Sequence, residues 1–508
     1  MDFERSTRVS VASQARELCK AALVLGAASL IATTATYAEA AQQPQLRWGG
    51  PGCTSRPALK QIVDDAFAAA PAGEFFGNGR GSGAPGYSVA LSRQGCGVFR
   101  YAVGVRDMTT GRRMTPRVRQ HIGSLTKMLN GVVSLRLAAA GAFGPQGLET
   151  PIDQFLTAEE ITLLTVGNDP QAPRCPADII ALNRTTQVPE PITGLCPDFS
   201  QITLRQLLNG NHGLFDFLNE VDRNANGFFD IEEPVLGALL DFLGIPRLTL
   251  PPQTETAFDL LAAFGVLAHP NATIGGTDLI DFEVSFGNTG QTLLGIVAQR
   301  VSGLTYNQLL ALAIPQPPGQ PPMLSLTAPA LTRPQVARQY LVTSNADLVG
   351  LPEDLFGLYP TLEIAGNPAI DVYDLGPFIG TNGGGGAGSV VATPNSYRRF
   401  FARLISGRLL NATEQQLFDS SFVTVAGLPG VEHGFGVFRF DDPAFGPGFA
   451  KSGRVTGSVC QFLHFERGTT TVVACRNSFD AFLRGTVPTS ATPVADLART
   501  LVGAVQDP

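Results

Sequence analysis

The chain has 508 residues, with 36 Lys and Arg against 43 Asp and Glu and a formal net charge of −7. This length can bury a large core and allows about two to four domains or one large two-part domain. Because no block of basic residues occurs beyond the N-terminus, a nucleic-acid partner is not expected. After the N-terminal segment no apolar run is long enough to span a bilayer.

The first 40 residues have the pattern of a secretory signal peptide. Basic residues precede an apolar stretch at 21–35, and Ala38-Glu39-Ala40 is a small-x-small cleavage site. A buried helix of the mature fold is the alternative for this stretch. We expect the mature chain to begin near Ala41 and to be periplasmic or secreted.

The cysteines agree with export. Loss of the signal removes Cys19 and leaves six of the seven, an even number typical of disulfide-bonded exported proteins. The sequence does not determine their connectivity, but two pairs would close short loops and the remaining two would form the third. In that order the pairs are Cys175 with Cys196, Cys460 with Cys475, and Cys53 with Cys96. No Cys and His spacing fits a zinc site.

Apolar periodicity predicts the first elements of the mature chain. An amphipathic helix is expected at 58–70, followed by a hairpin with strands at 86–91 and 97–104. A second helix is expected at 125–140, where Gly141 would end it. The start of this second helix carries the residues with the clearest chemistry.

Ser124 precedes Lys127 by three residues, so both side chains lie on one face of the first helical turn. A serine at a helix N-terminus lies where unpaired backbone N–H groups favour developing negative charge. A desolvated lysine loses its proton more easily and can act as the general base for that hydroxyl. The alternative is a helix N-cap followed by a lysine on a solvated face.

Further segments follow in a fixed order. Pro85-Gly86 opens the hairpin, Asp107-x-x-x-Gly111 and Ile122-Gly123-Ser124-x-x-Lys127 come next, and later come the helical segment 202–208, Phe286-Gly287-Asn288 and Lys451-Ser452-Gly453. Together they resemble the serine β-lactamase and penicillin-binding-protein superfamily. The resemblance is strongest to class C β-lactamases, D-Ala-D-Ala carboxypeptidases and related carboxylesterases.

The resemblance implies an α/β fold of the β-lactamase and transpeptidase type, an antiparallel sheet flanked by helices, with an inserted mostly helical domain. Residues 41–125 and 390–508 would form the α/β part, and 126–389 the helical part with two insertions, a disulfide loop at 157–197 and a second segment at 214–244. The catalytic site would lie in the cleft between the two parts.

The resemblance also assigns roles to residues. Ser124 would be the nucleophile and Lys127 its base, with Asn288 holding Lys127 and the substrate amide. Lys451 would add positive potential. The backbone N–H groups of Ser124 and Arg454 would form the oxyanion hole, with Ser452 and Gly453 beside the substrate.

The chain departs from the family pattern at two places. Phe286 replaces a tyrosine whose hydroxyl would pass a proton to the leaving group, and such a loss costs about a hundred- to ten-thousand-fold in rate. Asn211-His212-Gly213-Leu214 replaces the usual Thr-Ser-Gly-Leu. Either Lys127 and water suffice, another group such as His212 substitutes, or turnover is lost. A packed histidine is the alternative for His212, and the other histidines are interpreted as structural.

The segment 222–233 matches the twelve-residue EF-hand loop, with Gly227 at its sharp turn. Helix-like apolar segments, 214–221 and 235–243, flank it. A solvated turn is the alternative. The expected ligands of a weak structural Ca²⁺ site are Asp222, Asn224, Asn226, the Phe228 carbonyl, Asp230 and Glu233.

Together these features predict an exported serine hydrolase that acts on ester or amide bonds through an acyl-Ser124 intermediate. An esterase or carboxypeptidase is favoured over a β-lactamase, because deacylation would suffer most from the missing tyrosine hydroxyl. The expected partner is a small-molecule or peptide substrate, and the expected cofactor is structural Ca²⁺, with none for catalysis. The alternative is a binding module of the same fold that has lost turnover.

Overall fold

The computed structural model describes residues 48–68, 85–108, 110–167, 175–183, 188–216, 221–222, 256–269, 287–316, 322–325, 336–338, 340–344, 370–374, 385–425, 428–455, 457–480 and 493–506. The predicted signal peptide, Phe286 and all of the predicted calcium loop except Asp222 lie outside these residues.

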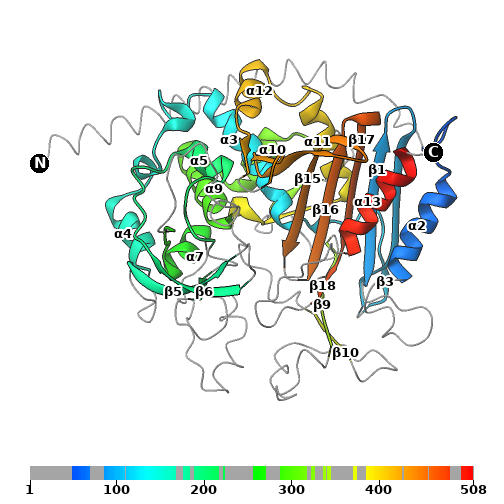
Figure 1. Cartoon of the computed structure of the whole chain (residues 1–508), viewed down its shortest axis with the longest axis horizontal. Coiled ribbons are helices and arrows are strands. Elements are labelled where there is room, and N and C mark those ends of the chain that lie inside the picture. Colours follow the sequence, from blue (N-terminus) through cyan, green and yellow to red (C-terminus); the bar gives the residue numbers. More distant parts are fainter. Residues whose placement is uncertain are drawn as a thin grey trace, which may run out of the picture.

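A nine-stranded antiparallel sheet forms one half of the described molecule (Figure 1), in the order β12-β13-β14-β15-β16-β17-β1-β2-β3. The predicted N-terminal hairpin is confirmed and forms two of its strands. In chain order the strands are β1 (Gly86–Arg93), β2 (Gly97–Asp107), β3 (Arg112–Arg113), β12 (Val423–Thr424), β13 (Glu432–Gly434), β14 (Val437–Asp442), β15 (Gly446–Val455), β16 (Ser458–Phe465) and β17 (Thr470–Arg476).

Helices cover both faces of this sheet. The first and last described helices, α2 (Arg56–Ala68) and α13 (Pro493–Gln506), share one apolar cluster with one face. The other face shares the largest cluster with α3 (Thr126–Ala139), α11 (Pro394–Ile405) and the helical half of the molecule. Because α3 belongs to this cluster, the helix that follows Ser124 lies between the sheet and the helical half (Figure 1).

The helical half contains α4 (Ala158–Val166), α5 (Leu204–Asn209), α7 (Ala257–Phe264), α9 (Asn288–Ser302) and α10 (Tyr306–Ala313), and α12 (Ala412–Asp419) follows α11. Short strands form three smaller sheets, β6-β5-β7, β4-β11-β8 and β10-β9-β18. Their bounds are β4 (Gln120–His121), β5 (Ala177–Asn183), β6 (Val188–Gly194), β7 (Val221–Asp222), β8 (Leu324–Ser325), β9 (Tyr340–Ser344), β10 (Ile370–Asp374), β11 (Val390–Ala392) and β18 (Ser478–Asp480). The 3-10 turns are η2 (Gly123–Leu125), η3 (Gly147–Glu149), η4 (Ile152–Phe155), η7 (Gly385–Ala387) and η8 (Arg467–Thr469).

The disulfide loop predicted at 157–197 contains the Cys175–Cys196 bond and also regular elements, because a capping box at Thr157 starts α4 and the strands β5 and β6 form a hairpin. The helix predicted at 214–221 is absent at both ends of that segment, since Leu214 bridges Ala268 and Val221 begins β7. At these two residues backbone pairing with a distant segment outweighs local apolar periodicity.

The disulfide pairs are the three predicted, two of them from short loops and Cys53–Cys96 by elimination. Cys53 bonds Cys96, Cys175 bonds Cys196, and Cys460 bonds Cys475 across the neighbouring strands β16 and β17. None of the helices in the described part of the chain combines the length and apolar character that crossing a bilayer needs.

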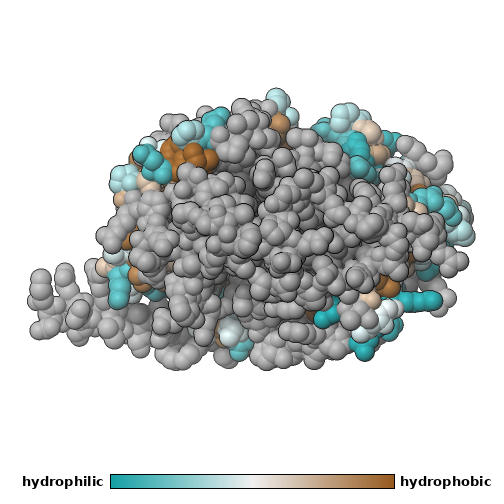
Figure 2. Space-filling view, turned by 90° about the horizontal axis from the view of Figure 1, so that it is seen from below, coloured by the Kyte–Doolittle hydropathy of each residue, from teal (hydrophilic) through white to brown (hydrophobic). Residues whose placement is uncertain are grey.

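The face seen in Figure 2 gives no sign of a broad apolar docking surface among the described residues that it shows. Brown areas on this face are small and lie among teal ones. The large apolar side chains that are most exposed in the described residues, Leu195, Leu312 and Leu428, come from three separate elements.

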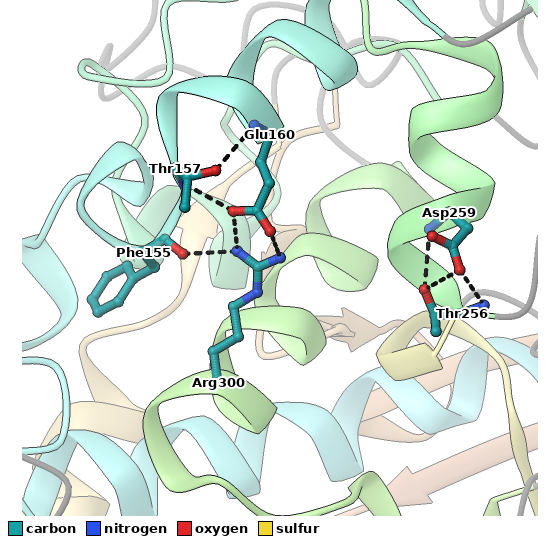
Figure 3. Close-up of polar contacts among 6 residues, drawn as sticks. All are labelled: Phe155, Thr157, Glu160, Thr256, Asp259 and Arg300. Atoms are coloured by element: carbon teal, nitrogen blue, oxygen red, sulfur yellow. Dashed lines mark hydrogen bonds and ion pairs between the residues drawn. The ribbon is translucent and has the colours of Figure 1, made fainter. Parts of the chain in front are cut away.

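A polar clamp joins α4 to α9 in the helical half (Figure 3). Arg300 donates to both carboxylate oxygens of Glu160 and, at 2.9 Å, to the Phe155 carbonyl. Glu160 also accepts the Thr157 backbone N–H at 2.8 Å and so completes the capping box. Burial alone would raise the pKa of Glu160, but hydrogen bonds from Arg300 and Thr157 outweigh it and lower this pKa below 4.5.

Glu160→Gln should lower the free energy of unfolding by about 1–2 kcal/mol at pH 7, because it removes a bidentate ion pair and weakens a helix cap. Because the pKa of Glu160 is lower in the folded than in the unfolded protein, the ionised carboxylate stabilises the fold at pH values above its unfolded-state pKa. This stabilisation is lost as the pH falls through the folded-state pKa. Urea unfolding at pH 7 and pH 3 measures both effects. The difference from wild type should shrink at pH 3, and exposed Glu159→Gln should change stability by only a few tenths of a kcal/mol.

Candidate active site

Ser124 lies in the 3-10 turn η2, between the short strand β4 and α3. Gly123 has φ +51°, a backbone conformation that other residues rarely adopt, and a Cβ there would lie 2.6 Å from the Arg454 backbone nitrogen. A Cβ on Gly453 would collide with the Ile122 carbonyl oxygen. Two glycines therefore let the turn that carries Ser124 press directly on the backbone of β15.

Lys127 lies one helical turn after Ser124 and is 2% exposed. Its Nζ is 2.7 Å from the Ser124 Oγ, 2.6 Å from the Asn288 Oδ1 and 3.4 Å from the Ala387 carbonyl oxygen. A Cβ on Gly436, in the turn between β13 and β14, would lie 2.5 Å from the Lys127 Cβ. The lysine is thus enclosed by segments from both halves of the molecule.

Asn288 is the first residue of α9 and links Lys127 to a buried carboxylate. Its Nδ2 donates to the Asp216 Oδ2 at 2.8 Å and to the Oδ1 at 3.1 Å. Asp216 is 1% exposed. The Thr289 hydroxyl donates to the Phe215 carbonyl at 2.7 Å, which joins the segment carrying Asp216 to the first turn of α9.

His212 packs beside this link and not at Ser124. Its Nδ1 accepts the Leu214 backbone N–H at 3.0 Å, and its ring lies so close to Gly290 that a Cβ there would collide with it. Burial lowers the pKa of His212 to about 4, an effect that the nearby Asp216 carboxylate partly opposes. These contacts favour the packed-histidine interpretation of His212.

Lys451 lies on β15 and is 2% exposed. Its Nζ is 5.7 Å from the centre of the Phe438 ring, a cation–π contact. Phe438 also faces His433, whose ring is 5.1 Å away. Burial and then the charge of Lys451 lower the pKa of His433 to about 3, to which Lys127 also contributes, so this neutral histidine lies within the field of both lysines.

The pairing of β14 with β15 ends at Phe438 and Ala450, whereas β15 continues to pair with β16 as far as Val455. Arg454, whose backbone nitrogen was predicted in the oxyanion hole, therefore lies beyond the β14 ladder and next to Gly123. The structure does not bring the Ser452 hydroxyl to Ser124. That hydroxyl donates to the Gln461 Oε1 on β16 at 2.7 Å.

Of the predicted calcium ligands, only the backbone of Asp222 lies within the described residues. It pairs with Ile180 of β5, and the other predicted ligands lie outside these residues. Within the described ranges no group of three or more His, Cys, Asp or Glu side chains could hold a metal ion. Phe286, one residue before Gly287, also lies outside them.

Sequence reasoning missed Asp216, which follows Gly213-Leu214 by two residues, because a lone Asp in a loop carries no signal of its own. His433 was interpreted only as structural, and its Nδ1 contacts the Asn209 carbonyl, 224 residues away, at 2.7 Å. Only the tertiary fold brings Asp216 to Asn288 and His433 to Asn209.

The geometry brings a serine hydroxyl, a buried lysine amine and an asparagine amide within hydrogen-bond reach of one another. Residues 59–282 match the family model named Beta-lactamase. This match includes Ser124, Lys127 and Asp216 and ends before Asn288 and Lys451.

Solved structures have the same fold. The D-amino acid amidase from Ochrobactrum anthropi SV3 is 18% identical, with 89% of this chain and 97% of that chain covered and a TM-score of 0.56. The D-stereospecific amidohydrolase from Streptomyces sp. is 19% identical, with 84% of this chain and 94% of that chain covered and a TM-score of 0.52. The penicillin-binding protein from Bacillus halodurans is 16% identical, with 88% of this chain and 99% of that chain covered and a TM-score of 0.51. These structures confirm the predicted fold class, and the family-model match over residues 59–282 supports the resemblance to the serine β-lactamase and penicillin-binding-protein superfamily.

Gly453→Ala should separate the Ser124 turn from β15, because the added Cβ collides with the Ile122 carbonyl. We expect a loss of at least about 2 kcal/mol in unfolding free energy, measured in urea. The matched control is Gly503→Ala in α13, where the nearest atom to a new Cβ is 3.8 Å away. That variant should change stability by less than about 1 kcal/mol, in the stabilising direction. Equal losses in the two variants would contradict the close contact.

Proposed function

We propose that this protein hydrolyses amide or ester bonds of small substrates through an acyl-Ser124 intermediate. The observation that carries the proposal is the position of the Lys127 Nζ, 2.7 Å from the Ser124 Oγ and 2.6 Å from the Asn288 Oδ1. A nucleophile needs a base within hydrogen-bond reach and a further group that orients the base. Both conditions hold here.

The surroundings of Lys127 suit a general base. An ammonium group has three N–H donors, and Nζ has three acceptors within reach, at Ser124, Asn288 and Ala387. A neutral amine keeps two donors for the two carbonyl oxygens and turns its lone pair to the Ser124 hydroxyl. Lys127 then takes the hydroxyl proton as Oγ attacks the carbonyl carbon of the substrate.

The later steps use the backbone beside Ser124. The Ser124 and Arg454 N–H groups hold the oxygen of the tetrahedral intermediate, and Lys451 adds positive potential. The leaving group departs with the proton held by Lys127, and water then releases the acyl group from Ser124. In this scheme no phenolic hydroxyl is required, so Phe286 slows proton transfer without abolishing the reaction.

An amide or ester substrate is favoured over a β-lactam. Two of the structural neighbours are amide hydrolases by name, the D-amino acid amidase and the D-stereospecific amidohydrolase. The missing tyrosine hydroxyl should slow deacylation most, and efficient β-lactam hydrolysis depends on this step. The proposal therefore includes acylation by a penicillin with slow release.

Acylation can be tested by intact mass after incubation with a fluorophosphonate and, separately, with a penicillin. The fluorophosphonate should add one adduct to the wild-type protein and none to Ser124→Ala. Ser134→Ala is the matched control, because Ser134 lies on the same helix α3 but its hydroxyl donates to the Asn130 backbone carbonyl. It should be labelled like wild type. A folded wild-type protein that neither reagent labels would contradict the proposal and favour the non-catalytic binding module.

The proposal also includes export and a structural calcium ion. The N-terminal pattern and the three disulfides support an oxidising compartment. The EF-hand-like spacing of oxygen ligands at 222–233 supports calcium, and Asp222 at the end of β7 would connect the ion to the disulfide-closed hairpin.

Calcium should raise the melting temperature of the mature protein by about 2–5 °C at 10 mM, and a chelator should reverse the rise. Glu233→Gln, which removes the bidentate ligand, should abolish the effect. Glu232→Gln, at a position of the loop that supplies no ligand, should retain it. The same melting temperature with calcium and with chelator would rule the calcium proposal out.

A further inference from the structure

We infer that Asp216 is a positioning residue of the acyl-transfer site, which acts by fixing the orientation of the Asn288 side-chain amide toward Lys127. This inference rests on the proposed function, because it assigns a residue to the same site. Asp216 was not among the residues that the sequence or the family resemblance singled out.

The first argument is the donor and acceptor chemistry of the two groups on either side of Asn288. An ionised carboxylate only accepts hydrogen bonds, and the resting ammonium form of Lys127, which must lose a proton before it acts as the base, only donates them. An asparagine amide between them has one favourable orientation, with Nδ2 toward Asp216 and Oδ1 toward Lys127. The observed contacts, 2.8 Å from Nδ2 to Asp216 and 2.6 Å from Oδ1 to Lys127, correspond to this orientation.

The second argument is burial. Asn288 is 8% exposed, while Asp216 and Lys127 are 1% and 2% exposed. Hydrogen bonds that involve a charged group are about twice as strong as neutral ones, and low solvent exposure preserves this strength. A flipped amide would place N–H groups against an ammonium and a carbonyl oxygen against a carboxylate. Asp216 therefore excludes the flipped state.

The third argument is that Asp216 itself has little freedom. The Phe215 N–H donates to the Leu267 carbonyl at 2.9 Å, and the Phe215 carbonyl accepts the Thr289 hydroxyl at 2.7 Å. On the other side of the chain, a Cβ at Gly287 would lie 3.6 Å from the Asp216 Cα. The carboxylate is thus fixed to the same helical turn that carries Asn288.

The negative charge has a second consequence for the base. Lys127 and Lys451 are both buried, and the charge of each lowers the pKa of His433. The Asp216 carboxylate, one side chain away from Lys127, offsets part of this positive charge. Its removal favours the neutral amine over the ammonium form, so labelling of Ser124 should begin at lower pH.

The test is the rate of fluorophosphonate labelling of Ser124 between pH 5 and 10 in wild type and Asp216→Asn. We expect the maximal rate to fall about tenfold, because the amide is free to flip, and the acid limb of the profile to move about one pH unit lower. In the Asn288→Ala background, Asp216→Asn should lower the maximal rate less than twofold, because the amide that it orients is absent.

Two results would overturn the inference. One is a rate within twofold of wild type with an unmoved acid limb. The other is a rate that falls equally at all pH values and falls again in the Asn288→Ala background, which indicates only a structural role. Asp442→Asn is the control for lost stability alone: Asp442 is a buried carboxylate paired with Arg499 at 2.7 Å, and its variant should melt lower but label normally.

The inference can be separated from the proposed function. If the wild-type protein is not labelled at all, the proposed function fails. The link between Asp216 and Asn288 can then still be tested by the melting temperatures of Asp216→Asn, Asn288→Ala and the double variant. Their effects should be clearly less than additive, and additive effects would overturn the inference. Asp216→Ser, which is uncharged but can still accept a hydrogen bond, takes the place of Asp216→Asn if that variant does not fold.

Discussion

The contact between Lys127 and its acceptors is the interaction on which the site depends. Lys127 lies in the first turn of the buried helix α3, and its Nζ reaches Ser124 on η2, Asn288 on α9 and Ala387 on η7. A buried amine without acceptors would be costly, so these segments must stay together for the lysine to remain inside. The same contacts therefore join the two halves of the molecule and, in the proposed function, prepare the serine for attack.

Close backbone packing makes this arrangement possible. Gly123 and Gly453 bring the serine turn against β15, and Gly436 brings the β13–β14 turn against Lys127. Side chains at these positions would hold the segments apart and move the Arg454 N–H away from Ser124. Backbone donors placed in this way need no reorganisation when negative charge develops on a bound carbonyl oxygen. The glycines thus contribute to the site because they have no side chain to keep these segments apart.

The charges around the site are arranged asymmetrically. Lys127 and Lys451 supply two buried positive charges, Asp216 supplies a negative one, and His433 and His212 are kept neutral chiefly by burial, which lowers their pKa values to about 3 and about 4. A net positive interior favours an anionic tetrahedral intermediate and disfavours the ammonium form of the base. We infer that Asp216 moderates this effect through Asn288, whose amide links its carboxylate to Lys127.

The sequence by itself determined the parts that depend on local spacing. Ser124 and Lys127 share a face because they are three residues apart, the hairpin at β1 and β2 follows from alternation, and short loops favoured the Cys460–Cys475 and Cys175–Cys196 bonds. The tertiary structure decided what depends on distant segments. Asp216 meets Asn288 across 72 residues, Leu214 bridges Ala268 and Val221 pairs with β5 where a helix was predicted, and the Ser452 hydroxyl donates to Gln461. Local propensity cannot report such contacts, because their free energy arises only when the chain has brought both partners together.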